Sequence, residues 1–282
     1  MSALGETQDR IASIRQLRTV VGAMRGIAAT HTQQARAALR GFRAYAGVIA
    51  GGLGRAVELL ETDGATAPPA QDGTAVVVFA AEHGLAGAFS ERVLDALAGQ
   101  RPASLFLVGA RGLALAEQRG LRADWASPMA SQASGVGATA RRVADALYAA
   151  FVAQRFTRAE MAYASLSETS QSTIVRRPIL PLDLERFRSP RPGPPPLANL
   201  PPRRLVERLV GEYVFAELAL AALESFASEN AARLATMESA RLNIEDKLEA
   251  LTAQERLQRQ EEITAEVQEV TFGALAAGVV EG

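Results

Sequence analysis

Apolar residues near both ends of the chain recur at alternating steps of three and four positions. This spacing is typical of helices that pack along a shared apolar seam. The N-terminal members of the seam are Ile14, Leu17, Val21, Met24, Ala28, His31, Ala35, Ala38, Phe42, Tyr45 and Ile49. The C-terminal members are Val206, Leu209, Tyr213, Ala216, Leu220, Leu223, Ala227, Asn230, Leu234, Met237, Arg241, Ile244, Leu248 and Leu251. The pattern predicts two long helices that form an antiparallel coiled coil.

The expected lengths of these helices limit the shape of the chain. The glycines at 51, 52 and 54 are plausible termination signals for the first helix, and the second is expected from Pro202 to Gly278. At the helical rise, residues 2–51 span roughly 75 Å and residues 202–278 over about 110 Å. A compact globule of this length is roughly 50 Å across, so we expect a coiled-coil rod beside a smaller domain. Asn230 and Arg241, which are polar members of the seam, either fix its register or face another subunit.

The central part of the chain has short apolar runs in place of the helical spacing. These runs predict strands at 75–81, 103–108, 159–166 and 173–180, and helical patterns lie at 89–98, 113–119 and 138–154. Alternating strands and helices predict a small Rossmann-like α/β domain with a parallel or mixed sheet. We therefore expect a coiled-coil helix at 1–57, an α/β domain at 58–200 and a second coiled-coil helix at 203–282. Nine prolines between Pro178 and Pro202 indicate a linker over 178–202.

The two end segments carry opposite charges, although the 282-residue chain has a formal net charge of only -1. Residues 1–57 hold eight Arg against Glu6 and Asp9, whereas residues 224–270 hold eleven acidic and five basic residues. These charges favour antiparallel pairing, with about 0–1 kcal/mol from each exposed pair. The Arg residues are scattered around the helix with few aromatic residues among them, so no nucleic-acid partner is expected.

The composition leaves little room for catalysis. The absence of Cys excludes disulfides and thiolate metal sites, and the presence of only two His disfavours a His-based site. The turn at 84–87 (GLAG) lacks the glycine patterns of nucleotide-binding loops. We expect no active site, cofactor or metal. The most apolar stretch, 209–226, contains three Glu, so no direct membrane span is expected. The N-terminus lacks a signal-peptide pattern, and we expect an intracellular protein that is soluble or at most peripheral.

Five motifs follow one another along the chain. Residues 10–14 (RIASI) and 23–29 (AMRGIAA) lie in the first helix, and the GLAG turn lies in the middle. Residues 224–246 (ESFASENAARLATMESARLNIED) and 259–270 (RQEEITAEVQEV) lie in the last helix. In this order they resemble the signatures of the γ subunit of F-type ATP synthases, with Ala in place of Cys in its G-L-C-G turn. The resemblance covers the whole chain.

The resemblance implies the central shaft of a rotary motor. In that family the coiled coil lies in the bore of a hexamer of three α and three β subunits. The α/β domain sits at the foot with the ε subunit, on a membrane ring of c subunits. This arrangement implies a peripheral protein on the cytoplasmic face of the bacterial inner membrane. Ion flow, for example of hydrogen ions, turns ring and shaft and drives ATP synthesis on β, and no bond is made on γ. The alternatives are a coiled-coil adaptor unrelated to ATPases and an α/β enzyme with a helical dimerisation hairpin.

The resemblance also implies contact residues. Arg259 and Gln260 match an Arg-Gln pair that hydrogen-bonds a loop of a β subunit, and Met24 and Arg25 lie where the shaft passes an acidic lever of β. The alternatives are a solvated face for Arg259 and Gln260 and a plain seam position for Met24. We expect coiled-coil packing by Ile14, Leu17, Val21, Leu234, Met237 and Ile244.

Two departures from the family pattern suggest a divergent member, of an alternative ATPase complex. The family usually has a basic residue after A-A-S, where this chain has Ala29-Thr30-His31. The family commonly has Asn-x-x-Arg-Gln near the C-terminal motif, whereas here residues 255–258 (ERLQ) precede Arg259 and Gln260.

Overall fold

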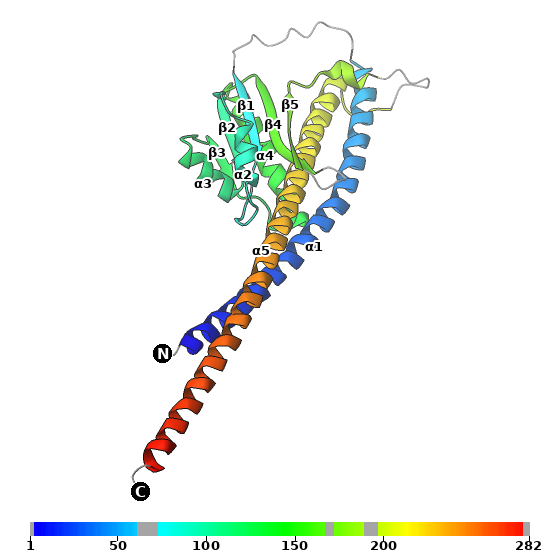
Figure 1. Ribbon diagram of the computed structural model, residues 1–282. Helices are drawn as coiled ribbons and strands as arrows, with labels where there is room; N and C mark the ends of the chain where they lie inside the picture. The colour runs from blue at the N-terminus through cyan, green and yellow to red at the C-terminus, as the bar shows by residue number, and fades with distance from the viewer. Residues whose placement is uncertain (1–2, 61–72, 167–171, 189–196, 279–282) are drawn as a thin grey trace. The chain divides into compact units, whose positions relative to one another are not determined.

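The computed structural model describes residues 3–60, 73–166, 172–188 and 197–278 (Figure 1). The chain folds as two compact units. The helical unit comprises residues 1–27 and 235–282, and the α/β unit comprises residues 28–234. Helix α1 (Ala3–Val57) and helix α5 (Pro202–Gly278) each contribute to both units. The prediction of one long helix at each end of the chain is confirmed.

Helix α1 ends at Val57, as the predicted 1–57 segment does, and the expectation that the glycines at 51, 52 or 54 end it is wrong. Each glycine weakens the helix by about 1 kcal/mol relative to Ala. The last turns stay helical because Leu53, Ala56 and Val57 are buried in a small apolar cluster with Val206. Burial of such side chains contributes roughly 1.5–3 kcal/mol for a residue the size of Leu, which offsets the cost of the glycines.

Gly54 is required where α1 touches the short 3₁₀ helix η2 (Leu184–Phe187), since a Cβ at Gly54 would collide with the Phe187 carbonyl oxygen. We expect Gly54→Ala to lower the free energy of unfolding by about 1–3 kcal/mol, the usual cost of overpacking. Gly51→Ala is the control, because nothing lies within 4 Å of its added Cβ. It should be neutral or stabilise the chain by up to about 1 kcal/mol. Equal thermal melting temperatures of the two variants would contradict the collision.

The α/β unit is built on a five-stranded mixed sheet. Its strands are β1 (Thr74–Phe79), β2 (Ser104–Val108), β3 (Trp125–Ser127), β4 (Arg158–Leu166) and β5 (Ser172–Leu180). They lie in the order β3-β2-β1-β4-β5, and all neighbours are parallel except β4 and β5. The four predicted strands and the α/β class are confirmed. Strand β3 has no counterpart in the prediction, because three residues are too few to give an apolar run.

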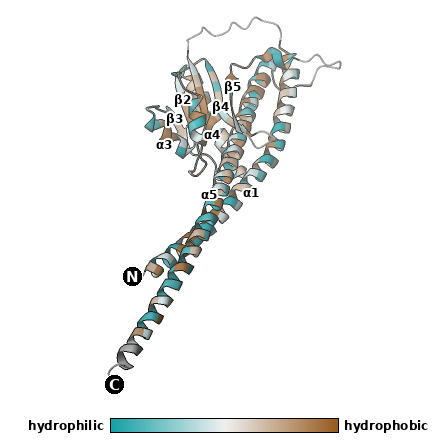
Figure 2. Cartoon of the chain, in the orientation of Figure 1, coloured by the Kyte–Doolittle hydropathy of each residue, from teal (hydrophilic) through white to brown (hydrophobic). Residues whose placement is uncertain are grey.

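Helices cover both faces of this sheet. They are α2 (Phe89–Asp95), α3 (Ala110–Gln118), the 3₁₀ turn η1 (Ala133–Gly135) and α4 (Val136–Val152). Side chains alternate along β1, so Val76 and Val78 face α2 and α3, while Val77 and Phe79 face α4, α1 and α5. Figure 2 shows hydrophobic colours on the strands that lie between these layers. Of the predicted Pro-rich linker, residues 178–180 belong to β5 and residues 189–196 lie outside the described residues.

In the helical unit, α1 and α5 pack as an antiparallel pair. Val21, Met237 and Ile244 are buried between them, and Ile14 and Met24 pack partly buried against this cluster. Gln8 donates a hydrogen bond to Glu255, and Arg25 forms an ion pair with Glu238 at 2.9 Å. Higher residue numbers on α1 therefore face lower numbers on α5. Leu234, the last residue of the α/β unit, is half-buried.

Leu17 differs from the expectation that it packs in the seam, because it is 51% exposed. Ile11 and Val21 are buried on α1, and Ile14 is partly buried. Arg18, a step of four from Ile14, is 58% exposed, and its guanidinium lies 3.9 Å from Glu245. The buried positions on α1 therefore skip from Ile14 to Val21, and neither Leu17 nor Arg18 is buried between the helices. In the described parts of the chain, no helix is both long and apolar enough to cross a membrane.

Candidate functional site on helix α5

The C-terminal end of α5 carries an uncovered apolar face. Residues 259–273 are exposed in the helical unit. Large apolar side chains stand on this segment with 53–72% of their surface exposed: Ile263, Val267, Val270 and Phe272. In Figure 2 the C-terminal part of α5 is coloured mostly hydrophilic, with a few hydrophobic bands. The steps of four and three from Ile263 through Val267 to Val270 place these three residues on one side of the helix. An apolar face of this kind is typical of a contact surface for another protein.

The residues expected to contact a partner lie at two separate places. Arg259 is exposed and forms an ion pair with Glu255 at 3.0 Å, and Gln260 beside it is also exposed. Met24 is half-buried against the Val21 cluster, whereas Arg25 reaches the surface and pairs with Glu238. The 21 residues of α5 between Glu238 and Arg259 correspond to roughly 30 Å of helix. The two sets therefore cannot form one site.

The Arg25 contact belongs to a small charged network. Arg241 donates hydrogen bonds to both Glu238 and Glu245 of its own helix, at 2.9 and 2.6 Å. Hydrogen bonds from Arg241 and then Arg25 lower the pKa of Glu238 below its ordinary value. Hydrogen bonds to Glu238 and then Glu245 raise the pKa of Arg241. Arg241, a polar member of the seam, is thus paired on both sides within α5.

The network predicts a pH dependence for the helical unit. A carboxyl group whose pKa is lower in the folded chain stabilises the fold above its unfolded pKa, which is about 4.3 for Glu. That contribution is lost as the pH falls through the folded value. We therefore expect wild type to melt at a higher temperature than Glu238→Gln near neutral pH. The difference between the two melting temperatures should shrink as the pH falls below about 4. Circular dichroism melts between pH 3 and 7 measure this difference. A difference that stays constant over this range would contradict the role of Glu238.

Four polar side chains of α5 contact the backbone of strands β1 and β4 and of the turn after β1 in the α/β unit. They are Ser225, Ser228, Glu229 and Arg233, each at most 8% exposed, and we refer to them as the α5 clamp. The hydroxyl of Ser225 donates to the Phe79 carbonyl at 2.7 Å, at the end of β1. The hydroxyl of Ser228 donates to the Ala164 carbonyl at 3.1 Å, near the end of β4. The motif at 224–246 thus contains the residues that attach α5 to two neighbouring strands.

Glu229 and Arg233 hold the turn that follows β1. The Glu229 carboxylate accepts hydrogen bonds from the backbone N–H groups of Glu82 and His83, at 3.2 and 3.4 Å. Arg233 forms a buried ion pair with Glu229 and donates to the carbonyls of His83 and Gly84. Sequence reasoning matched both residues to a motif but assigned them no contact, because their partners lie 146 to 150 residues away.

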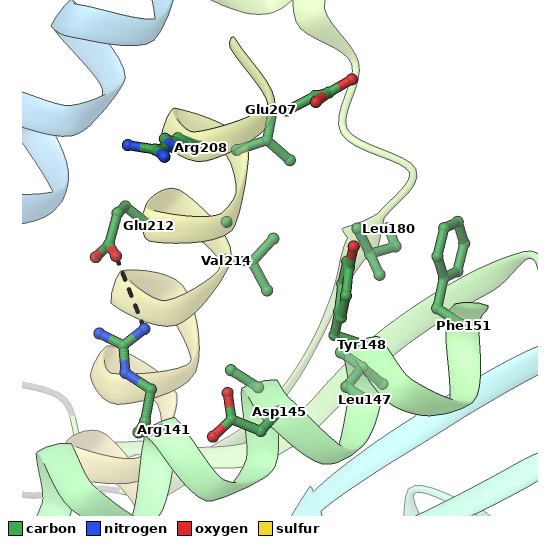
Figure 3. A pocket seen from close by; sticks show the side chains of 13 residues that line it. Arg141, Asp145, Leu147, Tyr148, Phe151, Leu180, Glu207, Arg208, Glu212 and Val214 are labelled. Carbon is green, nitrogen blue, oxygen red and sulfur yellow. Dashed lines mark ion pairs between the residues drawn. The ribbon is translucent and has the colours of Figure 1, made fainter. Parts of the chain in front are cut away.

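A groove of about 460 Å³ opens between α4 and α5 (Figure 3). Leu147, Phe151 and Val214 supply apolar walls, and an Arg141–Glu212 ion pair at 3.7 Å lies at one side. Among the described residues, no group of three or more His, Asp or Glu side chains is placed to hold a metal ion.

Comparisons with known proteins agree along the whole chain. The sequence model of a family described as ATP synthase matches residues 3–277. The ATP synthase gamma chain of Frankia casuarinae is 33% identical, with 98% of each chain covered. That of Parafrankia sp. is 30% identical with the same coverage.

Solved structures support the same fold. A chain of the Euglena gracilis mitochondrial ATP synthase (OSCP/F1/c-ring, rotational state 3) has a TM-score of 0.66 and 16% identity. The match covers 98% of this chain and 95% of that one. A chain from the central stalk and c-ring of the Tetrahymena thermophila enzyme has a TM-score of 0.57 and 19% identity, with 78% of this chain and 99% of that one covered.

These matches exclude the alternative of a coiled-coil adaptor unrelated to ATPases. The family model and relatives of at least 30% identity each span almost the full length. The chain therefore belongs to the family of ATP synthase gamma chains, the non-catalytic central rotor stalk of F-type ATP synthases.

Proposed function

We propose that this chain couples ion-driven rotation of a membrane c ring to the conformational cycle of catalytic β subunits. The partners are the α and β subunits of an α₃β₃ hexamer, the ε subunit and the c ring. The bacterial relatives and the partnership with a c ring support a peripheral location on the cytoplasmic face of the inner membrane. A rotating asymmetric shaft acts by changing which conformation of each β site is the more stable one.

The observation that carries the proposal is the uncovered end of α5. Ile263, Val267 and Val270 lie on a face that α1 does not cover, and the whole segment 259–273 is exposed. Leaving such a face in water is unfavourable by roughly 25 cal/mol for each Å² of apolar surface. Apolar surfaces of the surrounding subunits would cover this face. Apolar contacts are also non-directional, so they would allow the helix to rotate against those subunits.

Arg259 and Gln260 supply the polar part of the proposed contact with β. Both are exposed and close to the apolar face. Arg259→Ala with Gln260→Ala is expected to lower coupled ATP synthesis about tenfold, since a hydrogen bond to a charged group is worth about 1.5–3 kcal/mol. Assembly of the complex should be largely unchanged. Synthesis rates in membrane vesicles, with subunit content measured on the same vesicles, give the comparison.

The neighbouring acidic pair provides a matched control. Glu261→Gln with Glu262→Gln changes two exposed side chains on the next positions of the same helix. It should leave synthesis near the wild-type rate. Unchanged synthesis in the Arg259/Gln260 variant would exclude this contact, and failure of the wild-type chain to co-purify with α and β subunits would exclude the coupling function itself.

A further inference from the structure

The sheet has a topological switch point between β1 and β4. From β1 the chain builds outward through β2 to β3, and β4 then returns to pair with the other side of β1. In open α/β sheets, ligands bind in the crevice outside the carboxyl ends of the strands, at the position where the strand order reverses. Phe79 ends β1 and Leu166 ends β4. The crevice between these two ends is the ordinary ligand position of this fold.

The α5 clamp fills that crevice. Ser225 and Ser228 bond to the strand-end carbonyls of β1 and β4, and Glu229 lies beyond them against the turn after β1. Its carboxylate receives two successive backbone N–H groups, the arrangement by which strand-to-helix turns bind anionic ligands. Arg233 balances the carboxylate charge in a site where both side chains are at most 8% exposed.

The turn held by the clamp extends the contact to the other strands. The carboxylate of Glu82 accepts hydrogen bonds from the backbone N–H of Ala110 at 3.0 Å and of Met129 at 2.7 Å. Ala110 begins α3 after β2, and Met129 follows β3. One continuous network therefore joins α5 to the segments that follow β1, β2 and β3.

We propose that α5 occupies the ligand-binding crevice of the α/β unit in place of a ligand. The clamp takes the place and the hydrogen bonds of an anionic ligand, so no nucleotide binds in this crevice. It also fixes the sheet in one rotational setting around α5. Apolar contacts alone would resist rolling of the helix only weakly, because they are non-directional. Rolling that breaks the clamp would keep the Glu229–Arg233 ion pair, which lies within α5, but would separate both side chains from the backbone N–H and carbonyl groups of the turn. Buried polar groups that lose their hydrogen bonds are costly. The role in torque transmission rests on the proposed function.

Backbone amide hydrogen exchange on the isolated full-length chain tests the clamp. Glu229→Gln keeps the size of the side chain but removes its charge and one acceptor oxygen. The amides of residues 82 and 83 should exchange at least about tenfold faster, which corresponds to about 1.4 kcal/mol of lost local stability. The amides of 110 and 129 should follow them, while those of Val76–Val78 inside β1 keep their wild-type rates. Glu238→Gln, at an exposed ion pair of the same helix, should change none of these amides.

Three outcomes would overturn the inference. They are wild-type exchange at 82 and 83 in Glu229→Gln, uniform acceleration throughout the sheet, and protection of these amides in the wild-type chain by millimolar ATP. If Glu229→Gln does not fold, Arg233→Lys serves instead, since it keeps the charge but not the forked donors. It should accelerate amide exchange at residues 82–84 and leave the exchange of β1 amides at the wild-type rate. Because these experiments need no partner subunit, their failure is distinguishable from failure of the coupling function.

Discussion

Replacing Val21 by Asp is expected to separate α1 from α5 in the helical unit, whereas the same replacement at Leu17 should leave them paired. Both positions belong to the seam predicted from the sequence. In the structure, Val21 is 6% exposed and packs with Met237, while Leu17 is 51% exposed. A carboxylate buried without a partner costs several kcal/mol. A surface substitution usually changes stability by no more than about 0.5 kcal/mol.

Amide hydrogen exchange along α1 of the isolated chain gives the measurement. In Val21→Asp, residues 11–27 should lose protection by at least about a hundredfold, as expected for a loss of about 3 kcal/mol. In Leu17→Asp, exchange of these amides should remain within about threefold of wild type. Equal losses in the two variants would mean that Leu17 lies in the seam after all.

Replacing Gly109 by Ala is expected to destabilise the α/β unit strongly, although it adds only one methyl group. Gly109 joins β2 to α3 with φ +113°, a conformation that side chains rarely adopt. A Cβ there would also lie 2.5 and 2.7 Å from the carbonyl oxygens of Ala80 and Ala81. Backbone strain and overpacking together should cost about 3 kcal/mol or more. This corresponds to a melting temperature lower by roughly 6–12 °C for a unit of this size.

Gly99→Ala separates the two causes. Gly99 also has a positive φ, +74°, but nothing lies within 4 Å of an added Cβ. It should therefore cost only the left-handed strain, about 1–2 kcal/mol. Thermal melts of the two variants measure the difference. If Gly99→Ala lowers the melting temperature as much as Gly109→Ala, the close approach of Ala80 and Ala81 contributes nothing.

Periodicity was sufficient to predict the long helices and most strands. The bounds of α5 coincide with the predicted Pro202 and Gly278, since a sustained apolar spacing and a preceding proline-rich segment both act locally. Leu17 shows the limit of this reasoning. Steps of three and of four are both compatible with a seam, and which positions become buried depends on what α5 presents opposite them, which the spacing along α1 does not contain.

The candidate site was only partly accessible to the same reasoning. The exposed positions of Arg259 and Gln260 agree with either a contact or a solvated face, so only a family resemblance gave them a role. The α5 clamp was harder to predict, because a buried Glu229 is explained only by backbone N–H groups in a turn that lies far away in sequence. Side chains that bond to distant backbone leave no local pattern in a single sequence.

The position of α5 after every other described helix and strand has a consequence for biosynthesis. Leu218 and Leu223 complete the core on the α4 face, and Glu229 closes the turn after β1, so neither unit is complete until α5 has left the ribosome. Arg25 can form its ion pair only after Glu238 has been synthesised, 213 residues later. The entropy of closing so long a loop grows only logarithmically with its length, but the apolar side of α1 stays uncovered meanwhile and is open to aggregation. Folding of α1 against its partner residues therefore waits for the synthesis of α5, and the nascent α1 is a segment that a chaperone would protect until then.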